Sequence, residues 1–344
     1  MSSQVQAGRR DGPTRDAARR QRAALAAGGV RLGMRALSRI SPVLAARVMD
    51  HLWFRAPRTQ PQGEAQACLA RGRRSTLLVD GHRVAMWEWG DAGPCVLLLH
   101  GWGGHAGQLH AFVAPLLAAG MRVVAFDAPA HGASGASRHG RHRVTFFEFA
   151  AALQALTRRV GALAGVVAHS GGCTAIALAM RQGWRAPEHM VFVAPFCEPA
   201  AAVDGFARQL GIAGEAVQRF RTRAARWLGI SWSDLDIAAL PSHLRRGPLL
   251  VLHDRDDREV PIAQSQRLVE AWPGARLVET AGSGHRRILL QAQAVEAGVA
   301  FLATGARRMA TESDYWSDYL PVNSRGDLDL AYEATDIFWR RAVD

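Results

Sequence analysis

The chain has 344 residues, 49% of them hydrophobic, which is enough to bury the core of one large domain with extensions or of two small domains. The formal net charge of +12 comes from arginine alone, because the sequence contains no lysine. No stretch approaches the ~20 uninterrupted apolar residues of a membrane-spanning helix. No base-stacking or groove-reading motif accompanies the charge, so a nucleic-acid partner is not expected.

The charges are unevenly distributed along the chain. Residues 1–60 hold 12 arginines against three aspartates, whereas residues 309–344 hold eight acidic residues against three arginines. We therefore expect the acidic, aromatic C-terminal extension at 309–344 to pack against the basic N-terminal arm. The four cysteines form no CxxC pair and are interpreted as buried free thiols. Arginines interrupt the apolar residues that a secretory or twin-arginine signal would need, which predicts a cytoplasmic protein.

The basic arm at 1–60 is predicted to be helical after a disordered start. Residues 1–25 are polar and rich in arginine, alanine and glutamine, a composition interpreted here as disorder. Ser41 and Pro42 are typical of an N-cap followed by proline at the first helical position, so helices are expected near 28–40 and 42–54. We expect this arm to pack on the main domain. Weak peripheral contact with a membrane surface is the alternative.

The middle of the chain alternates between strand and helix patterns. After a linker at 58–63, β-rich runs at 75–79 and 82–89 flank Asp80-Gly81, which indicates a hairpin. The continuous apolar run at 95–99 is typical of a buried parallel strand. Further strands are expected at 122–126, 165–168, 190–194, 249–252 and 276–278, and helices near 106–118, 145–159, 172–182, 262–271 and 286–303.

This alternation predicts an α/β fold. Its central sheet is mostly parallel with helices on both faces, and the hairpin lies at one edge. The expected domain spans 75–303. Residues 198–245 are too long for an ordinary connection between strands and are interpreted as a helical cap, with a helix from Glu215 to Leu228.

One serine occupies the position of an activated nucleophile. In Val166-Val-Ala-His-Ser-Gly-Gly172 a strand ends, Ser170 follows and a helix begins. Ala168 and Gly172, two residues to either side, are small enough for the sharp turn of a nucleophile elbow. The pattern alone is weak, since such runs are common in a chain rich in alanine and glycine. Its context is Leu99-His-Gly-Trp-Gly-Gly104, which also follows a buried strand. We expect the backbone N–H groups of Gly171 and Trp102 to form an oxyanion hole.

A serine nucleophile needs a base, and the base needs an acid to orient it. Downstream, His253-Asp-Arg-Asp-Asp-Arg-Glu-Val-Pro261 follows one strand and Gly282-Ser-Gly-His-Arg286 follows another. His285 is the predicted base and Asp257 the predicted acid, with Asp256, Asp254 and the more distant Glu198 as rival acids. Because loops after parallel strands meet at one sheet edge, these side chains are expected to converge with Ser170. Asp127 and His131, which follow another strand, are interpreted as structural loop residues.

Together these segments resemble the α/β-hydrolase family. The resemblance covers roughly residues 75–303 and is carried by HGWGG, DAPAHGAS, AHSGG, DDREVP and GSGH, in the family's order. It implies that Asp257, which precedes x-x-Val-Pro, is the acid of a Ser-His-Asp triad. Two positions depart from the family pattern, because Ala168 and Asp254 occupy sites where members often carry glycine. Ser170 argues against haloalkane dehalogenases and epoxide hydrolases of this fold, which use an aspartate nucleophile.

The sequence therefore predicts a serine hydrolase that cleaves an ester, thioester or related acyl bond of a small-molecule substrate through an acyl-enzyme. Acyl transfer to another acceptor, C–C bond hydrolysis or a non-catalytic binding protein on the same fold are the alternatives. No cofactor is implied, and no cluster of histidine, cysteine and carboxylate residues has metal-ligand spacing. Arg219, Arg223 and Arg226 of the cap are interpreted as a solvated helix face rather than as a binding site for an acidic substrate.

Overall fold

The computed structural model describes residues 15–245 and 247–319, with side chains for 28–245 and 247–305. The chain divides into two compact units, residues 1–305 and 306–344. The described part of the second unit is the end of a helix that reaches Tyr319. The predicted packing of the segment at 309–344 against the arm therefore lies outside the described side chains.

The first unit is built on an eight-stranded sheet with the order β1-β2-β4-β3-β5-β6-β7-β8. The β1–β2 and β2–β4 pairs are antiparallel and all the others are parallel. The predicted hairpin and its place at the sheet edge are thus confirmed. The strands are β1 (Arg73–Val79), β2 (His82–Trp89), β3 (Cys95–Leu99), β4 (Arg122–Phe126), β5 (Gly165–His169), β6 (His189–Val193), β7 (Leu249–Asp254) and β8 (Ala275–Thr280).

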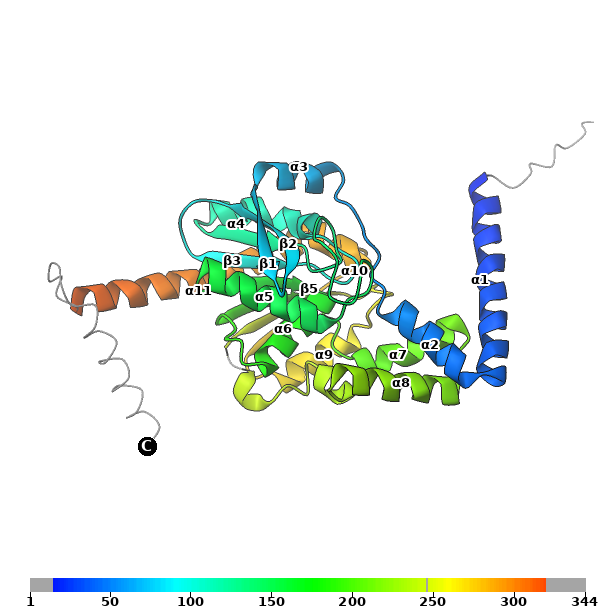
Figure 1. The fold of residues 1–344 in the computed structure, drawn as a ribbon. Helices are drawn as coiled ribbons and strands as arrows, with labels where there is room; N and C mark the ends of the chain where they lie inside the picture. Colours follow the sequence, from blue (N-terminus) through cyan, green and yellow to red (C-terminus); the bar gives the residue numbers. More distant parts are fainter. Residues whose placement is uncertain (1–14, 246, 320–344) are drawn as a thin grey trace, which may run out of the picture. The chain divides into compact units, whose positions relative to one another are not determined.

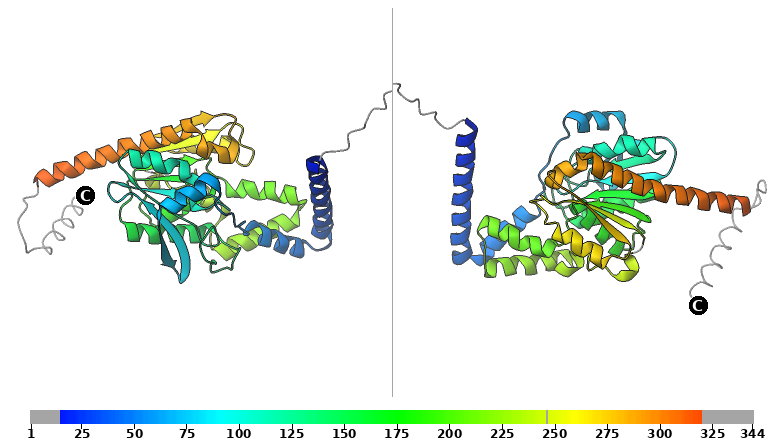
Figure 2. Two further views of the ribbon diagram at one scale, coloured as in Figure 1. Left: turned by 90° about the horizontal axis from the view of Figure 1, so that it is seen from above. Right: turned by 180° about the vertical axis from the view of Figure 1, so that it is seen from behind.

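Helices cover both faces of this sheet, as Figures 1 and 2 show: α5, α6 and α9 lie on one face, and α4 and the first turns of α11 on the other. Strands β3 and β5 are buried at every position, which explains their uninterrupted apolar sequences. The helices are α1 (Arg15–Ile40), α2 (Pro42–Trp53), α3 (Gly63–Arg71), α4 (Val113–Ala118), α5 (Phe146–Val160), α6 (Gly171–Arg181), α7 (Pro199–Leu210), α8 (Glu215–Leu228), α9 (Ala263–Ala271), α10 (Gly284–Arg287) and α11 (Ala292–Tyr319), with 3-10 helices η1 (Ala106–Phe112), η2 (Trp232–Leu235), η3 (Ser242–Leu244) and η4 (Ile288–Leu290).

The N-terminal arm and the cap share one hydrophobic core. Helix α2 packs on α8, and α1 packs on α2 and α7. Their buried side chains form one cluster (Ala45, Ala46, Met49, Phe54, Val203, Ala207, Ile212, Ala216, Val217, Phe220, Ala224). Figure 1 shows these four helices together at one side of the sheet domain. The arm is thus packed on the cap that the α/β domain carries.

Two sequence expectations were wrong in their details, and one helix, α3, was not predicted. Helix α3 follows the predicted linker and begins at its last residue, Gly63. Helix α1 begins at Arg15, inside the segment expected to be disordered. The helix expected near 286–303 is split into α10, η4 and α11, because Gln291 leaves the helical conformation between them. By contrast, α8 has the predicted bounds, and Ser41 caps α2 by accepting the N–H of Leu44.

Taken singly, none of the helices among the described residues has the length and apolarity to cross a membrane. One bent pair, Gly284–Leu290 with Ala292–Gly305, meets that test only when its two halves are combined.

Phe220 provides a test of the shared core between arm and cap. It is fully buried, and its ring lies within 6.4 Å of the rings of Trp53, Phe54 and Trp232. Phe220→Ala should lower the free energy of unfolding by about 3–5 kcal/mol, through lost burial and an unfilled cavity. Urea unfolding followed by tryptophan fluorescence measures this. The control Leu44→Ala, at an exposed site of α2, should change it by less than about 0.5 kcal/mol. Equal effects of the two substitutions would contradict the shared core.

Candidate active site

Ser170 lies in a strained turn between β5 and α6. Its backbone has φ 51° and ψ −120°, a region that residues with a side chain rarely adopt. Two hydrogen bonds hold this conformation: its N–H donates to the Val193 carbonyl at 3.0 Å, and its carbonyl accepts the N–H of Phe196 at 3.2 Å. A Cβ atom on Gly172 would lie 2.7 Å from the His100 carbonyl oxygen, so this position requires glycine. The turn leaves the Ser170 side chain partly exposed at the carboxyl edge of the sheet.

The structure brings Ser170, His285 and Asp257 together. The Nε2 atom of His285 lies 3.0 Å from the Ser170 Oγ atom, and its Nδ1 atom lies 2.7 Å from Oδ2 of Asp257. Because a carboxylate only accepts hydrogen bonds, Nδ1 carries a proton and Nε2 is free to accept the Ser170 hydroxyl. The imidazole is nearly buried and the carboxylate is completely buried. This arrangement is able to withdraw a proton from the Ser170 hydroxyl.

Four donors surround the Asp257 carboxylate. Oδ1 accepts the backbone N–H groups of Glu259 and Val260 at 2.8 and 2.9 Å. Oδ2 accepts His285 and also faces Nε2 of His253 at 3.2 Å. Burial raises the pKa of Asp257, but the hydrogen bonds from His253, His285 and Val260 outweigh it and hold that pKa well below its usual value. The carboxylate therefore stays ionised in its buried position.

His253 is a partner that sequence reasoning did not single out. Its Nε2 atom faces Asp257 and also the Val260 carbonyl at 3.1 Å; both are acceptors, so this nitrogen carries the proton. Its Nδ1 atom lies 2.6 Å from the Ser265 hydroxyl. A histidine fixed in this way contacts the same carboxylate oxygen of Asp257 as His285 does. The sequence feature that could have indicated this role is the position of His253 at the end of β7, four residues before Asp257.

The other three candidate acids, Asp254, Asp256 and Glu198, contact other residues and not His285. Asp254 accepts the Thr280 hydroxyl at 2.8 Å and the Ser283 N–H at 3.0 Å, which ties the loop of His285 to β7. Asp256 accepts the N–H of Gly282 at 2.8 Å. Glu198 pairs with Arg267 at 2.7 Å. Of the four candidate acids, Asp257 alone has a hydrogen bond to His285 among the described residues.

The loop after β3 places the Trp102 backbone nitrogen beside Gly171. A Cβ atom on Gly171 would lie 3.5 Å from that nitrogen. No hydrogen bond within the described part of the chain uses the N–H of either residue. The loop is fixed by Nε2 of His131, which accepts the Gly103 N–H at 2.9 Å, and by Asp127, which accepts the Ala106 N–H. These contacts agree with the interpretation of Asp127 and His131 as loop residues.

A third buried histidine supports the base. Nε2 of His169 donates to the His285 carbonyl at 3.0 Å, and the two rings lie 4.8 Å apart. Burial first, then the nearby His285, lowers the pKa of His169 to about 3, so its ring is neutral at neutral pH. No sequence pattern indicates this role of His169, because the role depends on the approach of the β8–α10 loop to β5.

Aromatic side chains flank the serine. The rings of Trp102 and Phe146 lie 5.3 Å apart, and those of Phe146 and Phe196 lie 6.4 Å apart. All three are partly exposed, and Phe146 comes within 2.9 Å of a Cβ atom placed on Gly171. An apolar surface therefore borders the edge at which Ser170 is exposed.

The alpha/beta hydrolase family model matches residues 96–298, which is more than half of the chain. The chain belongs to the α/β-hydrolase family. The family and the fold class predicted from the sequence are thereby confirmed. A comparison with curated proteins finds no match.

Solved structures share the fold of this hydrolase at low sequence identity. Est1E from Butyrivibrio proteoclasticus with bound ferulic acid has a TM-score of 0.52 and 19% identity, over 67% of this chain and 98% of that one. A putative lipase from Acinetobacter baumannii AYE has a TM-score of 0.53 and 17% identity, over 72% and 98%. A membrane phospholipase A described as a bacterial virulence factor has a TM-score of 0.52 and 15% identity, over 83% and 99%. Likeness at this identity shows the fold.

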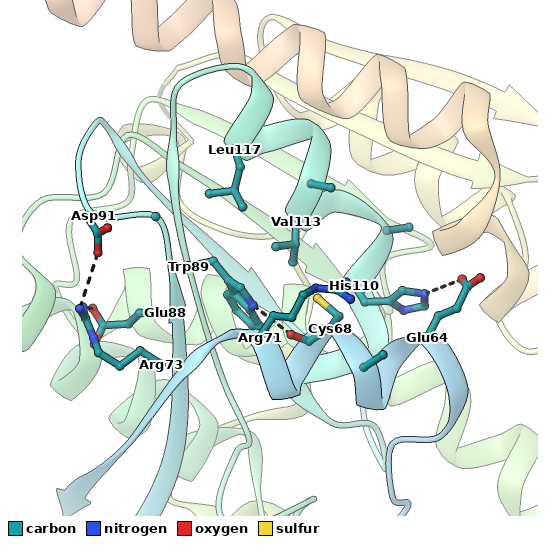
Figure 3. Close-up of a pocket in the computed structure, with 14 residues that line it drawn as sticks. Glu64, Cys68, Arg71, Arg73, Glu88, Trp89, Asp91, His110, Val113 and Leu117 are labelled. Atoms are coloured by element: carbon teal, nitrogen blue, oxygen red, sulfur yellow. Dashed lines mark hydrogen bonds and ion pairs between the residues drawn. The ribbon is translucent and has the colours of Figure 1, made fainter.

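A separate pocket of about 730 Å³ lies between α3, β2 and η1 and shares no residue with the cluster around Ser170. Figure 3 shows that charged side chains at its rim pair with one another. Arg73 pairs with Glu88 at 3.0 Å, and Glu64 lies 3.5 Å from His110. Burial raises the pKa of the Cys68 thiol in its wall. Since most of its charges are paired and its thiol is protonated, we assign no chemistry to this pocket. Within residues 15–245 and 247–319, no three or more His, Cys, Asp or Glu side chains are grouped so as to hold a metal.

The buried histidines of this hydrolase predict a loss of stability in mild acid. Burial lowers the pKa of His100 to about 4 and the pKa values of His131 and His169 to about 3. In the unfolded chain each would have a pKa of about 6.5, so below that pH the unfolded state binds up to three more protons than the folded state.

Above pH 7 these three histidines should therefore leave the free energy of unfolding independent of pH. As the pH drops from 6.5 to 4 they should lower it. The slope near pH 5 should be at most about 4 kcal/mol per pH unit. Urea unfolding at a series of pH values measures it. A free energy that stays constant between pH 7 and pH 5 would show that these rings are not held neutral.

Proposed function

We propose that this protein is a serine hydrolase that cleaves an ester, thioester or related acyl bond through an acyl-enzyme. The observation that supports it most is the unbroken path Asp257–His285–Ser170, with contacts of 2.7 and 3.0 Å and the hydroxyl on a strained, partly exposed turn. A serine hydroxyl needs an adjacent base to become a nucleophile, and this arrangement supplies one.

In the proposed reaction, His285 Nε2 takes the Ser170 proton as Oγ attacks the acyl carbon. The bond to the leaving group breaks as His285 returns the proton to that group, and the acyl chain remains on Oγ. Water then attacks with its proton passed to His285, and the proton returns to Oγ as the acid leaves. Asp257 stabilises the imidazolium in both steps without becoming protonated, in line with its lowered pKa.

The backbone N–H groups of Trp102 and Gly171 are the proposed oxyanion hole. Both are without a partner among the described residues, and the Trp102 nitrogen lies beside Gly171, the residue that follows Ser170. Loss of one such donor typically slows a reaction ~10²–10³-fold. Because these donors are backbone groups, the loop contacts of His131 and Asp127 maintain them.

The substrate we propose is a small molecule with an apolar acyl portion. The partly exposed rings of Trp102, Phe146 and Phe196 favour an apolar group beside the nucleophile. The solved structures with the same fold include Est1E bound to ferulic acid, a putative lipase and a membrane phospholipase A. The proposed steps need water and no cofactor.

Ser170→Ala should abolish covalent labelling by a fluorophosphonate probe, because the hydroxyl bonded to His285 is removed. Mass spectrometry of the intact chain measures the adduct. The control Ser283→Ala, beside the same loop, should label as the wild type does, since Ser283 contacts Asp254 through its backbone N–H. Persistent labelling of Ser170→Ala would overturn the assignment, and failure of the wild type to label would favour a non-catalytic binding protein.

His253 should act as a positioning residue for the acid. His253→Phe removes the donor at Asp257 and should lower kcat by about 10–100-fold with KM unchanged, since a hydrogen bond to a charged group contributes about 1.5–3 kcal/mol. His253→Gln retains a donor and should recover most of the rate. The downfield proton resonance of the His285–Asp257 hydrogen bond should shift in His253→Phe and not in His253→Gln. Equal loss in both variants would reduce His253 to a packing role.

A further inference from the structure

The corner between α1 and α2 exposes apolar side chains. The described residues expose eight large hydrophobic side chains, and five of them lie in this short part of the arm, with 42–83% of their surface exposed. We call these residues, together with the exposed arginines between them, the arm face: Val30, Arg31, Leu32, Arg35, Arg39, Ile40, Val43, Leu44 and Arg47.

The arm face is what remains after the arm has packed. Met34 and Leu37 of α1 and Ala45 and Met49 of α2 point into the core shared with the cap. Leu32 lies on the side of α1 away from Met34 and Leu37, and Ile40, the last residue of that helix, is 83% exposed. Packing within the described part of the chain therefore leaves the arm face uncovered.

The arginines of the arm face also lack partners. From residue 17 to residue 49 the sequence holds seven arginines and no acidic residue. Arg31, Arg35, Arg39 and Arg47 are exposed, and none forms an ion pair with another described residue.

Three of the four arginines of the cap helix α8 differ in this respect. Arg219 pairs with Glu215 at 2.6 Å, Arg221 with Asp204 at 2.9 Å, and Arg223 lies 3.8 Å from Asp50. Much of the positive charge of α8 is thus balanced by nearby carboxylates. The described residues place no carboxylate within ion-pair distance of the arginines of the arm face.

We infer that the arm face docks on the surface of an anionic lipid membrane. Apolar side chains between arginines match such a surface, because the apolar groups enter the boundary between headgroups and acyl chains while guanidinium groups bind phosphates. A nucleic acid would use the charge and leave the apolar side chains in water. The docking does not depend on the proposed hydrolysis, so Ser170→Ala should bind vesicles as the wild type does.

Flotation of the full chain with vesicles tests this inference. The wild type should float with vesicles of phosphatidylcholine and phosphatidylglycerol, not with phosphatidylcholine alone, and the binding should weaken with added salt. Arg35→Gln/Arg39→Gln should lower the affinity about 30-fold, because an arginine near an anionic surface contributes about fivefold. The matched control Arg219→Gln/Arg226→Gln removes the same charge from the cap and should change the affinity far less.

A second variant tests the apolar part of the arm face. Leu32→Ser/Ile40→Ser leaves the charge intact and should weaken vesicle binding by at least about tenfold, with an unchanged melting temperature since both side chains are exposed. The inference would be overturned if the wild type did not float, or if the arm and cap arginine variants lost affinity equally. It would also be overturned if Leu32→Ser/Ile40→Ser lost no affinity and the chain bound duplex DNA tightly. That combination marks a general affinity for polyanions.

Discussion

Ser170 holds a positive φ angle because two neighbouring segments close around it. The end of β6 accepts its N–H and the following loop donates to its carbonyl, while the glycine at 172 lets the loop after β3 approach to contact distance. A conformation of this kind costs on the order of 1–3 kcal/mol and persists only where its surroundings enforce it. This one turn places the Ser170 hydroxyl 3.0 Å from Nε2 of His285, so the rest of the candidate site depends on it.

The same edge is kept rigid by buried polar groups that form hydrogen bonds between neighbouring loops. The Asp257 carboxylate accepts two donors on each oxygen, which uses the four sites that a carboxylate offers. In a medium of low dielectric constant, a saturated carboxylate remains ionised and an unsaturated one does not. Asp254 and Asp127 act in the same way on other loops, each joining two segments through backbone N–H groups. The histidines at 100, 131 and 169 stay neutral and complete these connections.

Much of the fold could be predicted because parallel strands buried on both faces appear as short apolar runs, and those runs alternate with helical patterns. Ser170 and His285 could be proposed because each stands directly after such a run. The choice among Asp254, Asp256 and Asp257 could not be derived from spacing, since it depends on the turn in which the Asp257 N–H donates to the Asp254 carbonyl. His253 was missed for a similar reason: its role needs Ser265 of α9 and the carbonyl of Val260 to fix its proton.

The errors at the N-terminal side have a different cause. Residues 15–27 and helix α3 are rich in alanine, glutamine, leucine and arginine, which have high helix propensity. The polarity of residues 1–25 led to a prediction of disorder, and the residues of α3 were given no prediction, although the helix propensity of both segments is high. The break at Gln291 could not be foreseen, because continuous helical periodicity runs through it. In each case the prediction followed the pattern of apolar residues and not the conformational preference of the backbone.

The measurement that tests the account most directly is a crystal structure of the chain after reaction with a phosphonate ester. We predict a covalent bond from the Ser170 oxygen to phosphorus, with the phosphoryl oxygen about 2.7–3.1 Å from the backbone nitrogens of both Trp102 and Gly171, and with His285 still bonded to Asp257. Phosphorus on another side chain, or a phosphoryl oxygen turned away from both nitrogens, would contradict it.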